Sequence, residues 1–217
     1  MDKCPNQNIK IILEILMKKF FFTSCLFATL FSFYGCDQNL SHFQKYKNPH
    51  ILTQARQKML TLELKGDPNE TASKAFSILY KIYYKLDDPK NGVENQFPRA
   101  RWPISADLPR NEWVGIFGIP VSDKIEQLPQ DYESMNPPVK IEYWEYGTIA
   151  QILHIGTYAQ EKPTIDKLVR FIKSHNLTIT GVHEEIYLKS RGMFFKGDEN
   201  KYQTLILYPV EKTNVKE

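Results

Sequence analysis

An alternating pattern of apolar and polar side chains in residues 181–188 predicts a β-strand with two different faces. The mainly apolar face contains Val182, Glu184, Ile186 and Leu188, and the other contains Gly181, His183, Glu185 and Tyr187. A carboxylate between an imidazole and a phenol is costly to bury unless a cation or a proton pairs with it. Glu185 is therefore a candidate ligand-binding residue. A solvated outer face of an ordinary strand would give the same pattern.

The rest of the chain predicts two similar runs of elements. Leucines at every second position of residues 60–64 indicate a strand, and a three-to-four-residue apolar period over residues 72–86 indicates an amphipathic helix. Strands at 100–104 and 112–121 complete a β-α-β-β order. After a proline-containing connector, residues 139–155 are expected to form a hairpin around Gly147. A helix opened by Pro163 and strands at 181–188 and 202–210 then follow.

The two runs, residues 59–121 and 139–212, read as a weak internal repeat. Neither half could bury its helix and one sheet face well alone. We therefore predict one α+β domain over residues 59–212, with two pseudo-twofold β-α-β-β repeats forming an antiparallel sheet. A ligand cleft is expected between the halves, and residues 213–217 are a tail. The 42% hydrophobic content, with 13% aromatic residues, supports a folded globular chain.

The first 35 residues have the pattern of a secretory signal peptide. A basic pair, Lys18-Lys19, precedes the uncharged run 20–35, and the true start of translation is expected at Met17. The run is shorter than the roughly 20 apolar residues that a spanning helix needs. Phe33-Tyr34-Gly35-Cys36 resembles a bacterial lipobox. Cys36 is therefore expected to be lipidated, with palmitate as one of its acyl chains. An ordinary signal peptide cut nearby is the alternative.

This leader predicts an exported protein, held by a lipid on the periplasmic side of a bacterial membrane or at the cell surface. Residues 36–58 are expected to be the lipidated Cys36 and a polar tether. Without residues 1–35 the formal charge falls from +3 to +1, because four lysines and two acids are removed. No internal disulfide is then possible, and a nearly neutral body lacks the basic footprint of a nucleic-acid binder.

Three stretches resemble the GyrI-like small-molecule-binding domain of bacterial multidrug-sensing regulators. They are 154–158 (His-Ile-Gly-Thr-Tyr), 183–188 (His-Glu-Glu-Ile-Tyr-Leu) and 204–210, which ends in Tyr-Pro-Val. The resemblance is good over residues 139–210 and faint over 60–121. Thr157 stands where the family usually has proline, and the Asp-Pro that tends to follow the family's Tyr-Leu is missing. We expect no DNA-binding helices before the domain.

The resemblance implies that Glu185 is the acidic residue at the base of a ligand pocket, with Tyr187 on the same face. Trp102 and Tyr158 are candidate aromatic walls, and His183 is the remaining candidate contact. Aromatic rings around a carboxylate favour flat or cationic ligands. Trp102 and Tyr158 are equally compatible with a role as plain core aromatics.

The leading hypothesis is a membrane-tethered domain that binds a small aromatic or cationic amphipathic molecule. The GyrI-like family that this chain resembles also includes hydrolases of electrophilic toxins. A hydrolase that uses Glu185 and Tyr187 as general acid or base is therefore an alternative. An adaptor for another cell-envelope protein is a third. We expect binding rather than catalysis, with no cofactor and no metal, because the histidines lack zinc-motif spacing. The sequence indicates neither the ligand nor an oligomeric state.

Overall fold

The computed structural model describes residues 40–103, 108–190 and 197–213. Its strands are β1 (His50–Gln54), β2 (Gln57–Lys65), β3 (Arg99–Trp102), β4 (Val114–Pro120), β5 (Val139–Trp144), β6 (Gly147–Ile155), β7 (Leu177–Ile179), β8 (His183–Lys189) and β9 (Gln203–Lys212). The α-helices are α2 (Pro68–Tyr83) and α3 (Lys162–Ser174). Short 3₁₀ helices are η1 (Leu40–Lys47), η2 (Arg110–Glu112), η3 (Gln130–Tyr132), η4 (Tyr158–Gln160) and η5 (Glu199–Lys201).

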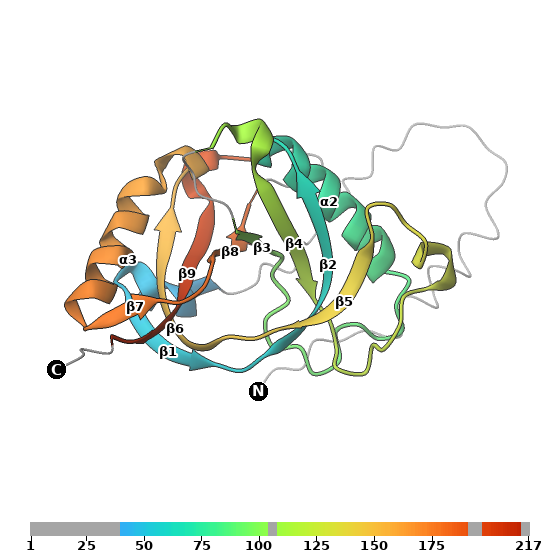
Figure 1. Cartoon of the computed structure of the whole chain (residues 1–217), viewed down its shortest axis with the longest axis horizontal. Helices are drawn as coiled ribbons and strands as arrows, with labels where there is room; N and C mark the ends of the chain where they lie inside the picture. Colours follow the sequence, from blue (N-terminus) through green and yellow to red (C-terminus); the bar gives the residue numbers. More distant parts are fainter. Residues whose placement is uncertain (1–39, 104–107, 191–196, 214–217) are drawn as a thin grey trace, which may run out of the picture. The chain divides into compact units, whose positions relative to one another are not determined.

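The strands form one curled antiparallel sheet in the order β1-β6-β9-β8-β3-β4-β2-β5, and β7 adds to β9 (Figure 1). The two repeats are β2-α2-β3-β4 and β6-α3-β8-β9. Their equivalent strands lie at equal distances on either side of the β8–β3 pair, so the sheet order is symmetric about that pair. The α+β fold with two pseudo-twofold repeats is therefore confirmed. The observed β3 and β4 are shorter than the predicted strands at 100–104 and 112–121, and Ile104 lies outside the described residues.

The predicted hairpin within residues 139–155 is wrong. β5 pairs with β2, whereas β6 pairs with β1 and β9. The chain does turn at Gly147, which has φ +69°, but the two strands diverge to opposite halves. β1 and β2 behave in the same way, and Figure 1 shows each strand pair as one ribbon that crosses the bottom of the molecule. Each crossing strand covers a sheet edge that a local hairpin would leave open.

The predicted polar tether is also wrong for residues 40–58. Residues 40–47 form η1, whose Phe43 is buried, and residues 50–54 pair with β6 as an edge strand. Edge strands tolerate polar side chains because one edge and part of each face meet water. The weak apolar pattern of this stretch is therefore typical of an edge strand. Residues 1–36, including Cys36, lie outside the described residues.

The core has two sides, separated by the sheet. On one side α2 covers β2 and β4, with Leu79 and Ile82 fully buried, and α3 covers β6 and β9 through Leu168 and Ile172. On the other side η1 packs through Phe43 against residues of β6 and β9. Asp67 caps α2 by accepting a hydrogen bond from the backbone N–H of Asn69. Within the described residues, no helix has the length and apolar character needed to cross a membrane.

Candidate carboxylate site between the two helices

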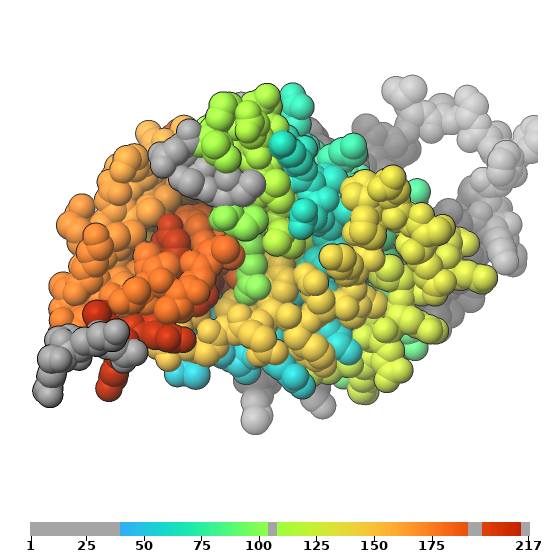
Figure 2. All heavy atoms as spheres, viewed as in Figure 1, coloured from blue at the N-terminus to red at the C-terminus, as the bar shows by residue number. Residues whose placement is uncertain are grey.

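The β3–β8 pair is the junction of the two halves, and α2 and α3 flank it on one face (Figure 1). Its register sets Trp102 opposite His183 and Ala100 opposite Glu185. Because side chains alternate, all of these lie on the face that carries the helices. Figure 2, viewed from the same side as Figure 1, shows the orange and red second half beside the green and cyan first half.

Glu185 lies at the centre of this junction and is 8% exposed. Its Oε1 is 3.0 Å from Nε2 of His183, and its Oε2 accepts a hydrogen bond of 2.8 Å from the Tyr187 hydroxyl. Burial by itself would raise the pKa of Glu185, but the hydrogen bonds from His183 and Tyr187 outweigh it and the pKa is lowered. Glu185 is thus an ionised carboxylate held in the interior by polar donors.

Aromatic side chains surround this carboxylate. The Tyr187 ring makes edge-to-face contacts with Phe76 of α2 and Tyr158 of η4, each at 5.9 Å between centroids. Trp102 packs edge-to-face on Phe117 at 5.6 Å. The buried indole Nε1 of Trp102 has no close hydrogen-bond partner in the described part of the chain, yet its N–H also helps to lower the pKa of Glu185. These contacts join α2, η4, β3 and β8 around one charge.

The space for Trp102 depends on a glycine in the neighbouring strand. A Cβ atom on Gly115 of β4 would lie 2.9 Å from the Trp102 ring and 2.6 Å from the Phe117 ring. Any larger residue at position 115 would displace both rings, because real Cβ atoms do not approach other atoms so closely. The glycine therefore sets the position of the Trp102 side of the site.

A second carboxyl group, Glu161, lies beside Glu185. It directly precedes α3, is 6% exposed, and its Oε1 has no hydrogen-bond partner among the described residues. Burial first, and then the charge of Glu185, raise the pKa of Glu161 to about 10. Two neighbouring buried carboxyl groups cannot both ionise cheaply, so Glu161 holds the proton and Glu185 the charge.

The two histidines of the sequence motifs have different roles. His183 bridges the site, because its Nδ1 is 2.9 Å from the Tyr208 hydroxyl while its Nε2 faces Glu185. His154 is buried and makes its hydrogen bonds elsewhere, with Nδ1 3.0 Å from Thr164 Oγ1 and Nε2 3.0 Å from the Thr157 carbonyl. His154 thus ties β6 to the start of α3. Among the described residues no group of three or more His, Cys, Asp or Glu side chains could hold a metal ion.

Glu185 is buried beneath aromatic side chains of the site. Neither of two cavities on the described residues includes Glu185 in its lining. Tyr158 is the most exposed of the site's rings, at 39%, and it packs on both Tyr187 and Tyr202. Among the described rings of the site, Tyr158 is therefore the one most accessible from solvent.

A family model described as "GyrI-like small molecule binding domain" matches residues 47–211, about three quarters of the sequence. The chain belongs to the GyrI-like family. It is therefore a small-molecule-binding domain, and the resemblance in the three motif stretches is confirmed. The match begins at residue 47, which agrees with the observed η1 and β1 rather than with the predicted tether. No curated protein matches the sequence significantly.

Solved structures share the GyrI-like fold at low identity. An uncharacterised conserved protein from Listeria innocua is 21% identical with a TM-score of 0.62, and a hydrolase from Listeria innocua is 19% identical with a TM-score of 0.58. Each alignment covers 79% of this chain and 98% of the other. EcmrR, seen in complex with DNA, is 13% identical with a TM-score of 0.56, over 95% of this chain and 68% of the other.

The structure brings the sequence-predicted site residues of this GyrI-like domain together. Glu185, Tyr187, His183 and Trp102 share one face, and Tyr158 contacts Tyr187 from η4. Their binding roles remain predictions. The sequence reasoning missed Glu161, whose place before a proline-opened helix is typical of an acid that merely favours the helix N-terminus. The pKa of Glu185 is lowered, and the raised carboxyl pKa of the site belongs to Glu161.

Proposed function

We propose that this domain binds a small organic cation with an aromatic body, and that Glu185 is the counter-charge. The observation that carries the proposal is an ionised, buried carboxylate whose partners, within the part of the chain that the structure describes, are a histidine and a tyrosine rather than an arginine or lysine. A cation entering this site would gain a full charge partner in a poorly solvated environment. Ring faces would add roughly 0.5 to 2 kcal/mol each.

The position of the aromatic side chains supports the same ligand class. Tyr158 and Trp102 come from opposite halves of the fold and lie on two sides of the central carboxylate. When Tyr158 swings away, a flat ligand would replace its ring contact with Tyr187 and reach Glu185 beneath. Such an exchange of one aromatic contact for another keeps the apolar surface covered in both states.

A matched pair of ligands tests this proposal. N-methyl-4-phenylpyridinium carries a permanent charge, and 4-phenylpyridine has the same ring system without it at pH 7.5. The cation is expected to stabilise the purified protein against thermal unfolding by about 2.7 kcal/mol at 100 times its dissociation constant. At the same concentration, the neutral compound is expected to stabilise the protein much less.

Variants locate the effect. Glu185→Gln should abolish the preference for the cation, while Glu63→Gln, which removes a charge from an exposed position on β2, should keep it. Equal stabilisation by both compounds would argue for an apolar site without a charge requirement. A cation effect that survives in Glu185→Gln would place the binding site elsewhere.

We further propose that the domain is exported and tethered to a bacterial membrane by a lipid on Cys36. The support is the sequence order of a basic pair, an apolar run and Gly35-Cys36. Metabolic labelling with a palmitate analogue in a bacterial host tests it. The wild type should take up the label and partition with membranes, and Cys36→Ser should do neither. An unlabelled but secreted wild type would instead indicate an ordinary signal peptide.

The pair of carboxyl groups favours a second candidate function, hydrolysis of a strained electrophile. Glu161 is protonated where Glu185 is ionised, which is the arrangement of a general acid beside a general base. Glu161 would donate its proton to the leaving atom of an opening ring. Glu185 would take a proton from the water that forms the new bond to carbon.

Glu161→Gln separates the two functions. A hydrolase should lose most of its kcat on a probe such as styrene oxide, because the proton donor is gone. A binding protein should retain its affinity for the aromatic cation, because Glu185 is still charged. Turnover by the wild type no faster than by the Glu161→Gln variant would remove the hydrolase from consideration.

A further inference from the structure

A second cluster of buried charges lies on the opposite face of the same strand pair. Glu184 of β8 is 1% exposed, and its Oε2 is 2.7 Å from Nε of Arg101, its cross-strand neighbour on β3. The Tyr146 hydroxyl donates a hydrogen bond of 2.8 Å to Oε1 of Glu184 and accepts one of 2.8 Å from Nη1 of Arg99. The cluster thus contains two guanidinium groups and one carboxylate.

The charges of this cluster are not balanced. Arg101 takes the close contact with Glu184, and its guanidinium also lies 4.0 Å from the centre of the Trp144 ring. Arg99 is 2% exposed, yet its Nη1 is 3.7 Å from Glu184, which is too long for a hydrogen bond. Nε of Arg99 is buried without any partner among the described residues. A buried guanidinium with unused donors is costly unless an anion or water completes it.

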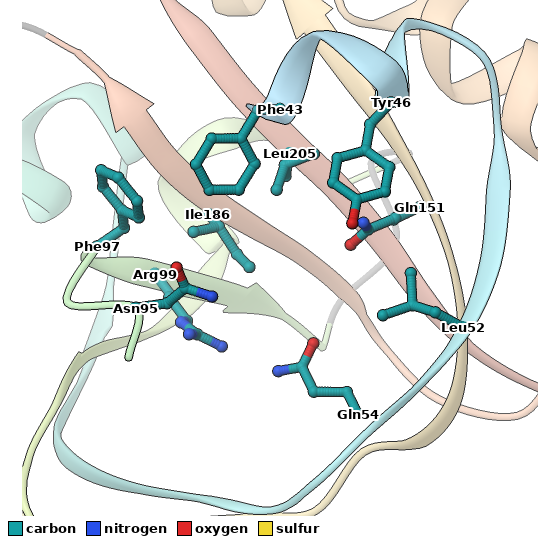
Figure 3. Close-up of a pocket in the computed structure, with 10 residues that line it drawn as sticks. All are labelled: Phe43, Tyr46, Leu52, Gln54, Asn95, Phe97, Arg99, Gln151, Ile186 and Leu205. Atoms are coloured by element: carbon teal, nitrogen blue, oxygen red, sulfur yellow. The ribbon is translucent and has the colours of Figure 1, made fainter. Parts of the chain in front are cut away.

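Arg99 lines a cavity of about 90 Å³ on this face (Figure 3). The figure shows its guanidinium pointing into the space between Asn95 and Gln54, with Gln151 on the far wall. Arg99 is the one charged residue among those that line the cavity, and no acidic residue lines it. The amide groups of Gln54, Asn95 and Gln151 provide further N–H donors around the same space.

The remaining wall of the cavity is apolar. Ile186 and Leu205 come from the sheet, and Phe43 and Phe97 close the space from η1 and from the loop before β3. The Phe43 and Phe97 rings pack edge-to-face at 5.6 Å. The volume exceeds the roughly 10–15 Å³ of such space that one water needs. The cavity thus has cationic and amide hydrogen-bond donors on one side and an apolar wall on the other.

We propose that this cavity binds a small organic anion, a monocarboxylate with a short apolar chain. The carboxylate would take the unused donors of Arg99 and the amide N–H groups, and the chain would lie against Phe43 and Phe97. An inorganic anion is a poorer ligand, because it would leave the apolar wall in contact with water. A large aromatic acid is too big for the cavity of about 90 Å³. The site is independent of the proposed cation site, because β3 and β8 separate the two.

The test measures the dissociation constant of propionate by ligand-observed NMR on the purified full chain at constant ionic strength. Propionamide, which has the same size and no charge, is the matched ligand. We expect saturable binding of propionate and at least about ten-fold weaker binding of propionamide, since charged hydrogen bonds are lost.

Two variants assign the binding to Arg99. Gln54→Glu introduces a carboxylate into the cavity that pairs with Arg99, so propionate should bind at least about ten-fold more weakly. Gln127→Glu adds the same charge at an exposed position and should leave propionate binding unchanged. Arg99→Lys keeps the charge but loses the planar fork, and should also weaken binding. If Arg99→Lys fails to fold, Gln54→Glu decides.

Glu185→Gln should bind propionate like the wild type, which distinguishes this site from the proposed cation site. The proposal is overturned by equal affinities for propionate and propionamide, by non-saturable effects, or by undiminished binding in Gln54→Glu. Each of these results would mean that the cavity holds only water around Arg99.

Discussion

Glu184 and Glu185 are adjacent in sequence and both buried, yet their surroundings have opposite chemistry. Glu184 is paired with Arg101 in a cluster that carries more positive than negative charge. Glu185 is surrounded by a histidine, tyrosines and a second carboxyl group, and among the described residues no guanidinium or ammonium group pairs with it, so this face carries a negative charge there. A single strand pair therefore separates a cationic interior from an anionic one. The comparison shows that burial alone does not predict what a glutamate does.

The largest difference between the two faces is expected in stability. Glu184→Leu leaves two guanidinium groups buried without their carboxylate, and should lower the free energy of unfolding by about 3 to 5 kcal/mol. Glu185→Gln keeps its hydrogen-bonding shape and leaves no buried charge behind, so it should cost less than about 2 kcal/mol. Urea denaturation at pH 7 measures both. Similar losses would mean that the two faces tolerate charge removal equally.

The next difference is in pH dependence, and its sign follows from Glu161. The folded state keeps the Glu161 proton up to about pH 10, whereas the unfolded chain loses it near pH 4.5. The folded state therefore binds more protons in this window, and its stability falls as pH rises from about 5 to 10. Glu185 acts in the opposite sense, since its lowered pKa makes stability fall as the pH drops below its ordinary value of 4.5.

Glu161→Gln should remove this alkaline loss. We expect the stability of the variant relative to the wild type to rise by up to about 1.4 kcal/mol for each pH unit above pH 5, and the two proteins to be nearly equal at pH 4. Urea denaturation at several pH values provides the comparison. A wild type and variant that differ by the same amount at every pH would contradict a protonated Glu161.

The smallest expected effect concerns the aromatic cover of the Glu185 face. Tyr158→Ala should weaken aromatic cation binding by about two- to five-fold, because one partly exposed ring is worth about 0.5 to 1 kcal/mol. Tyr158→Phe should keep the affinity. Tyr84→Ala removes an exposed ring at the end of α2 and serves as the control. Titration of N-methyl-4-phenylpyridinium measures all three, and an undiminished affinity in Tyr158→Ala would show that this ring takes no part.

Propionate binding should be unaffected by every change on the Glu185 face. Conversely, the cavity variant Gln54→Glu should leave the cation affinity unchanged. Crossed effects would show that the two faces communicate through β3 and β8, which would make the strand pair a coupled unit rather than a partition.

Much of the fold was predictable because its signals are local. The two-residue period of residues 181–188 placed Glu184 with Ile186 and Glu185 with Tyr187, and the structure keeps that division. The helical periods over residues 72–86 and after Pro163 predicted both helices. The hairpin prediction failed because the sequence does not record which distant strand a segment pairs with. β5 and β6 are neighbours in the chain but pair with β2 and β9.

The sequence by itself determined the two faces of each strand, the order of the repeats and the family. It could do so because side-chain alternation and short motifs are properties of neighbouring residues. Only the tertiary structure decided that Glu161 lies beside Glu185, and that Tyr146 contacts Arg99, 47 residues before it, and Glu184, 38 residues after it. Such long-range contacts depend on how the crossing strands close the sheet, and that closure is set by the packing of both halves together.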